Sequence, residues 1–194
     1  MRETSRNITF IFAFALMAIS TLQAQQAVVP PPRPADSGPS LEKTMQFIQE
    51  NAAEGKLSYT AFVTDASQQG VEWRNQFTVE TSNLVAGAGA CRITYHWRAE
   101  LNGKLAADAD YSLALKDVKE IFVLPQDQNQ NQVDNRNGHP DWNSRISPPL
   151  FVLIAKRPRG LVNVFLFSDE EMANRVAKAI THAVELCGGG KDAF

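Results

Sequence analysis

The feature that most constrains the fold of this chain is a series of alternating segments that ends in a single amphipathic helix. In VEWRNQFTVE (71–80), apolar side chains occupy every second position except Asn75, with polar side chains between them. This period of two is typical of strands in a sheet with one buried face. Strands are predicted near residues 57–65, 71–81, 90–100, 105–115, 118–124, 150–156 and 161–167.

The segment that follows, SDEEMANRVAKAITHAVELCGG (168–189), has the period of a helix. Ser168 and Glu171 predict a capping box at its start, and Gly188 is expected to end it. One face is polar and includes His182, while the other is apolar. The apolar stripe consists of Met172, Val176, Ala179, Ile180, Ala183 and Cys187. We expect this stripe to cover the open end of the sheet.

The first 24 residues have the layout of a signal peptide. Arg2 and Arg6 precede the apolar run ITFIFAFALMAIS, and small residues favour cleavage after Ala24. This run is too short to span a bilayer, and no later segment approaches that length. We therefore expect a periplasmic or secreted protein without a transmembrane segment after signal removal.

A Pro-rich spacer is predicted over residues 25–39 and an N-terminal helix over 40–54. Proline fixes φ and removes backbone donors, so the spacer should be extended; a Pro-rich recognition motif is the alternative. Ser40 is the expected helix cap, and Gly55 the expected stop. The helix has a partial apolar stripe made of Leu41, Met45, Phe47 and Ile48.

The charge balance and the histidine spacing argue against several function classes. The chain has 19 basic and 21 acidic residues, a formal net charge of −2, so nothing favours nucleic-acid binding. His96, His139 and His182 have no zinc-type spacing with cysteines or carboxylates. We therefore expect no metal and no cofactor.

The dipeptide Asn102-Gly103 predicts a hairpin between the third and fourth strands. A two-residue loop would mix buried and exposed faces, because a shift of one residue reverses every side chain. We therefore expect a three-residue loop that pairs Glu100 with Lys104. This register places His96 opposite Asp108, either as a base with its orienting carboxylate or as part of a solvated charge ladder.

Residues 126–149 form a long polar stretch with few aliphatic side chains, which predicts a loop that is either functional or mobile. Trp142 and His139 within it are candidate contacts for a partner, although the tryptophan could instead fold back onto the sheet. Arg157 and Arg159 occupy the next hairpin tip and are further candidate contacts, with a solvated turn as the alternative.

The phrases YSLALKDVKEIFV (111–123) and VFLFSDEEMANRVAKAITHAVELCGG (164–189), together with the order of elements, resemble exported bacterial proteins of the pleckstrin-homology-like superfold. The resemblance implies an α+β fold over residues 55–190, a seven-stranded antiparallel sheet or barrel capped by the C-terminal helix. Pleckstrin-homology modules that bind phosphoinositides carry basic residues in the first hairpin loop. That loop is DASQQG (65–70) here, so no phosphoinositide binding is expected.

In this arrangement both cysteines face the interior, because Cys91 belongs to the inward set of the third strand and Cys187 to the helix stripe. An exported chain meets an oxidising compartment, which favours a disulfide between them. Two buried free thiols are the alternative.

These features predict an exported, non-catalytic binding module of the bacterial cell envelope, whose partner is a protein or a small ligand. A structural subunit of an envelope assembly is one alternative. A hydrolase that uses His96 and Asp108 is another, although no nucleophile is identifiable beside them.

Overall fold

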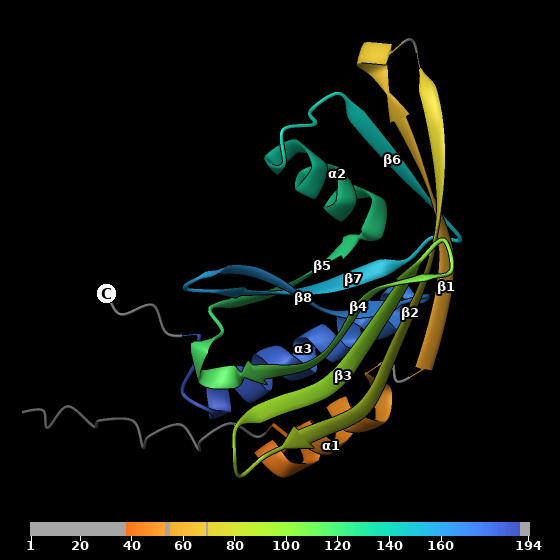
Figure 1. The fold of residues 1–194 in the computed structure, drawn as a ribbon. Coiled ribbons are helices and arrows are strands. Elements are labelled where there is room, and N and C mark those ends of the chain that lie inside the picture. Colours follow the sequence, from red (N-terminus) through yellow and green to blue (C-terminus); the bar gives the residue numbers. More distant parts are fainter. Residues whose placement is uncertain (1–37, 53–54, 69, 191–194) are drawn as a thin grey trace, which may run out of the picture. The chain divides into compact units, whose positions relative to one another are not determined.

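A computed structural model describes residues 38–52, 55–68 and 70–190 of the protein. These residues form an α+β unit in which eight strands make two antiparallel sheets and three α-helices pack around them (Figure 1). The α+β class and the antiparallel pairing are as predicted. The predicted signal peptide (1–24) and residues 25–37 of the predicted spacer lie outside the described residues.

The larger sheet has five strands in the order β4-β3-β2-β1-β6, and the smaller has three in the order β5-β7-β8. No strand pairing joins the two sheets within the described residues, so they do not close into one barrel, and β4 and β8 each remain an edge. The strands of the larger sheet are β1 (Gly55–Asp65), β2 (Val71–Gly87), β3 (Arg92–Leu101), β4 (Lys104–Ala114) and β6 (Trp142–Ser147). Those of the smaller sheet are β5 (Glu120–Pro125), β7 (Phe151–Arg157) and β8 (Gly160–Phe167).

The main core lies between the C-terminal helix α3 (Glu170–Leu186) and the strands it covers. Figure 1 shows α3 beneath the three-stranded sheet, next to α1 (Leu41–Asn51). The buried face of α3 consists of Ala173, Val176, Ala177, Ile180, Ala183 and Val184. Met172, Ala179 and Cys187 of the predicted stripe are partly buried beside it. The helix therefore packs on the sheets with its apolar face, rotated toward Ala173 and Ala177, but these sheets form no closed barrel whose open end it could cover.

The cap of α3 differs from the predicted one. Asp169, not Ser168, is the N-cap, and its Oδ1 accepts a hydrogen bond from the Met172 backbone N–H at 2.6 Å. Aspartate at this position adds a negative charge at the positive end of the helix dipole, which a serine cannot do. At the N-terminal helix, Ser40 is the cap as predicted, since its hydroxyl accepts from the Lys43 N–H at 3.4 Å.

Two contacts tie α1 and the residues before it to the core. Met45 and Ile48 of α1 are fully buried against α3, which agrees with the predicted stripe. His182, which was expected on the polar face of α3, is half-buried. Its Nε2 donates a hydrogen bond to the Pro39 carbonyl at 3.0 Å. Gly55 does not end the helix but begins β1, because α1 already ends at Asn51.

The register of the β3–β4 hairpin differs from the prediction, although the faces agree with it. Leu101 pairs with Lys104 across a two-residue turn, whose Asn102 and Gly103 both have positive φ (50° and 73°). A bulge in β4 leaves Ala106 unpaired. This extra residue shifts the rest of β4 by one position, so that its apolar side chains face the same side as those of β3. The predicted pairing of His96 with Asp108 is therefore wrong by two residues, and Asp110 is its direct cross-strand partner.

The predicted polar loop at 126–149 is also wrong, because it contains the helix α2 (Gln126–Arg136) and the strand β6, which is one strand more than the seven expected. The helix is attached to the sheet by polar side chains rather than apolar ones. Asn131 Oδ1 accepts from the Ser144 N–H at 2.6 Å, and Asp134 Oδ2 from the Ser144 hydroxyl at 3.3 Å. Hydrogen bonds of this kind satisfy buried polar groups, so low hydrophobicity did not prevent folding.

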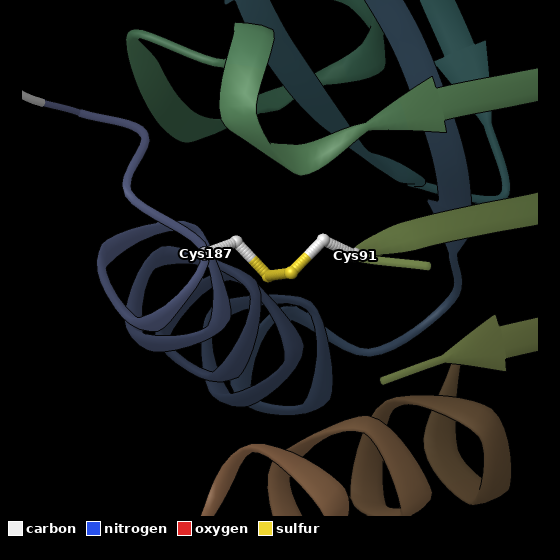
Figure 2. Close-up of a disulfide and its surroundings, with 2 residues drawn as sticks. All are labelled: Cys91 and Cys187. Atoms are coloured by element: carbon white, nitrogen blue, oxygen red, sulfur yellow. A yellow bond between two sulfur atoms is a disulfide. The ribbon is translucent and has the colours of Figure 1, made fainter. Parts of the chain in front are cut away.

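The two cysteines form a disulfide, as predicted, with a Cα–Cα distance of 5.8 Å (Figure 2). It joins the end of α3 to the turn immediately before β3, so Cys91 is not inside the strand as expected. Cys91 has a φ of 46°, and its carbonyl accepts from the N–H of Leu115, the first residue of the short helix η2 (Leu115–Asp117). The disulfide and this backbone hydrogen bond together connect α3, β3 and η2.

Replacement of Cys91 and Cys187 by serine is expected to lower the free energy of unfolding by roughly 2–5 kcal/mol, because the cross-link closes a long loop. Urea denaturation measures this difference. Reduced wild-type protein is the matched control and should unfold near the midpoint of the double variant. An oxidised wild type no more resistant to urea than the double variant would contradict the expectation.

The segment after α3 packs too closely for a side chain at Gly189. A Cβ there would lie 2.5 Å from the Leu115 carbonyl oxygen and 2.8 Å from Val184 Cγ1. Gly189→Ala is therefore expected to destabilise the protein by about 1–3 kcal/mol, the usual cost of overpacking. Gly89→Ala is the control, since nothing lies within 4 Å of a Cβ there. Equal melting temperatures for the two variants would show that this contact does not matter.

Candidate functional site

A cavity of about 510 Å³ is lined by the edge strands of both sheets, β4 and β8, and by α2. Residues of β1, β2 and β3 line it as well. It lies beside a second, smaller core that includes Tyr59, Val79 and Ala99. The open edges of the two sheets therefore border a hollow rather than a filled interior.

The walls of the cavity are mainly apolar, and six of the side chains that line it are aromatic. Tyr59 stacks on Phe77 with ring centroids 5.0 Å apart, and Tyr95 stacks on Tyr111 at 5.6 Å. Trp97 meets Tyr111 edge-on at 6.0 Å. Aromatic pairs in these geometries stabilise one another beyond simple burial, so the walls are held in place without a ligand.

Small side chains on β3 and β4 explain why the space between these rings is not filled. Ala99 pairs directly with Ala107 across the two strands, and the bulged residue Ala106 lines the cavity as well. A bulge brings two successive residues toward the same side of a strand. Three alanines therefore lie where larger residues would otherwise complete the core.

Helix α2 supplies the polar wall of the cavity. Gln126, Asn129, Val133 and Arg136 all line it, and their spacing of three, seven and ten residues from Gln126 places them on one helical face. Gln126 and Asn129 are buried, and the Asn129 amide donates to Gln126 Oε1 at 3.4 Å. Burial raises the pKa of Tyr59 to about 12, although a hydrogen bond from Gln126 partly opposes this.

Arg136 is the one charged residue among the described residues that line the cavity. It is exposed at the end of α2, and no carboxylate in the described part of the chain lies within ion-pair distance of it. Within the described ranges, the cavity therefore combines mostly apolar walls and a few amides with one positive charge that has no ionic partner there.

Trp142 and His139, the first pair of predicted contacts, lie together outside this cavity. Their rings stack with centroids 3.9 Å apart, and Trp142 also meets Trp73 at 5.6 Å. The Trp142 indole N–H donates to the buried Asp65 carboxylate at 3.2 Å. The tryptophan is thus half-buried and anchored on the sheet, while His139 is exposed.

Asp65 is held in its charged form by the donors around it. The Ser67 hydroxyl (2.6 Å) lowers its pKa most, and the Ser67 backbone N–H and the Trp142 indole lower it further, against the opposing effect of burial. These bonds fix the short helix η1 (Ala66–Gln68) at the end of the β1–β2 hairpin, which gives Trp142 a structural partner.

Arg157 and Arg159, the second pair of predicted contacts, are at the β7–β8 hairpin, on other elements than Trp142 and His139. Arg159 is exposed in the turn. The Nε of Arg157 is buried, and none of the residues described accepts a hydrogen bond from it. Its charge acts on the nearby Tyr95, whose pKa is nevertheless raised because burial is the larger effect.

His96 lies between two carboxylates on the outer face of β3 and β4. Its Nδ1 is 2.9 Å from Asp110 Oδ1, and its Nε2 is 2.9 Å from Asp108 Oδ1. The hydrogen bond to Asp110 raises the pKa of His96 most, and both negative charges add to it against partial burial. Because each ring nitrogen can donate to a carboxylate only when protonated, this arrangement favours the imidazolium.

No group of three or more His, Cys, Asp or Glu residues suited to a metal ion occurs within the described ranges. None of the helices described between residues 38 and 190 has the length and apolar character needed to cross a membrane.

No protein-family model, no curated protein and no solved structure matches this chain.

The alternating pattern predicted the strands that line this space, but it did not reveal the cavity. The α2 face was missed because a helix with one apolar residue, Val133, has no hydrophobic period to detect. The available signal was the spacing of Gln126, Asn129, Val133 and Arg136, which becomes visible only if a polar segment is tested for helical periodicity.

The raised pKa of His96 can be measured by following its ring signals in an NMR titration. Asp110→Asn is expected to lower this pKa toward the ordinary histidine value, while Asp117→Asn, an exposed carboxylate in η2, should leave it unchanged. Since the folded-state pKa is raised, the stabilisation is present at acidic pH and is lost as the pH rises through that pKa. Identical titrations in the wild type and Asp110→Asn would contradict the pairing.

Proposed function

We propose that this protein is an exported, non-catalytic binding module of the bacterial cell envelope that holds a small ligand in the cavity between β4 and β8. The observation that carries the proposal is a space of about 510 Å³ with apolar walls, six aromatic side chains among them, and a few convergent polar groups. Small-molecule sites in proteins have this character and typically occupy about 300–1,000 Å³.

The location in the envelope rests on two supports. The predicted signal peptide implies export, and the Cys91–Cys187 disulfide is compatible with an oxidising compartment. We also propose that the fold is a variant of the pleckstrin-homology-like arrangement, opened between β4 and β8. Antiparallel strands followed by the capping helix α3 support that assignment.

The cavity favours a small ligand over the contact surface predicted around Trp142. That side chain bonds to Asp65 and packs on Trp73, so much of its surface is already in use. The structural-subunit hypothesis stays a prediction that no observation favours. The hydrolase hypothesis also stays a prediction, and it is weakened because Asp108 and Asp110 occupy both ring nitrogens of His96, which leaves neither free to take a proton from a substrate.

Cavity filling tests the proposal. The probe is 1-anilinonaphthalene-8-sulfonate, whose fluorescence should rise saturably with the wild-type protein. Ala107→Trp places an indole into the cavity and is expected to abolish this signal, whereas Ala90→Trp adds the same side chain at an exposed turn and should not.

Near-UV circular dichroism verifies that each variant keeps native packing, because loosened proteins also bind this dye. Absence of saturable binding to the wild type, or equal binding by a well-folded Ala107→Trp variant, would overturn the proposal.

A further inference from the structure

We infer that the cavity selects amphipathic monoanions, molecules with an apolar body and one negatively charged group, and that Arg136 binds the charged group at the cavity mouth. This inference rests on the proposed function and specifies its ligand class. It follows from how charge and hydrogen-bonding capacity are distributed along α2.

The acidic residues of α2 point away from the cavity. Asp134 accepts hydrogen bonds from Gln130 at 2.8 Å and from the Ser144 hydroxyl, which fixes it toward β6. Asp127 accepts from the Gln128 backbone N–H at 2.7 Å and is not part of the lining. No described carboxylate therefore lines the space that Arg136 faces, and a cationic ligand would meet only repulsion there.

The deeper polar groups of the cavity already have partners. Asn129 bonds to Gln126, and Gln126 bonds to Tyr59, so this end of the helix face does not require a polar ligand group. The neighbouring rings of Tyr59 and Phe77 offer it an apolar contact surface instead. Arg136 is the member of the lining that is left with an unmatched charge.

The neutral part and the charged part of this helix face lie at opposite ends of α2. Gln126 is buried and Arg136 is exposed, and ten residues of α-helix span about 15 Å. Val133 lies between them on the same face. The wall thus changes from buried and neutral at one end to exposed and cationic at the other, which matches a ligand with an apolar body and an anionic end.

An extended peptide is the competing occupant. The edges of β4 and β8 both have unpaired backbone groups, to which a strand could add. Such binding depends on main-chain hydrogen bonds and would be insensitive to the charge of Arg136. The charge dependence of binding therefore separates the two occupants.

The test compares decanoate with the uncharged 1-decanol by isothermal titration calorimetry. Decanoate is expected to bind the wild type more tightly than decanol. Arg136→Gln should weaken decanoate binding by about tenfold or more, the usual effect of removing a hydrogen bond to a charged group, and should leave decanol binding unchanged. Arg145→Gln is the matched control, because Arg145 lies over the Phe62 ring (4.3 Å) and does not line the cavity.

Equal affinities for decanoate and decanol, or no effect of Arg136→Gln, would overturn the charge selection. The proposed function would survive that result if Ala107→Trp still abolished binding of the dye. Failure of both decanoate and decanol to bind would also overturn the inference, and binding of extended peptides in their place, unaffected by Arg136→Gln, would identify the cavity as a strand-addition site.

Discussion

The burial of one face of α3 is the interaction on which the rest of this structure depends. Val176 and Ile180 are fully buried, and this face of the helix contributes to a core shared by both sheets and α1. Each fully buried aliphatic side chain of this size contributes about 1.5–3 kcal/mol. The disulfide at Cys187 and the close packing of Gly189 then fix the C-terminal end of the helix against η2.

The cavity is a consequence of this arrangement. The two sheets share the core around α3, but no backbone pairing joins β4 to β8. On that side Ala99 and Ala107 leave space between the aromatic rings, and α2 covers the space with two amides, one valine and one arginine. Apolar burial therefore stabilises one end of the unit, and polar attachment shapes the other end, where we place the ligand.

The elements with strong periodicity were predictable from the sequence, and the elements held by polar contacts were not. α3, the long hairpins and the Cys91–Cys187 bond follow from hydrophobic pattern and compartment. α2 and β6 depend on specific hydrogen bonds, such as those of Asn131 and Asp134 with Ser144. Secondary-structure propensities do not include such tertiary contacts. The predicted β3–β4 register was wrong for a related reason. A bulge at Ala106 aligns the buried faces of the two strands as effectively as a longer loop does.

The most direct test of the account is where a ligand binds, and the three tryptophans of the chain report on it separately. Trp97 lines the cavity, whereas Trp73 and Trp142 pack together outside it. In a two-dimensional NMR titration with decanoate, the account predicts that the indole N–H signal of Trp97 shifts and saturates while the other two stay in place. Movement of the Trp73 and Trp142 signals with a stationary Trp97 would contradict it.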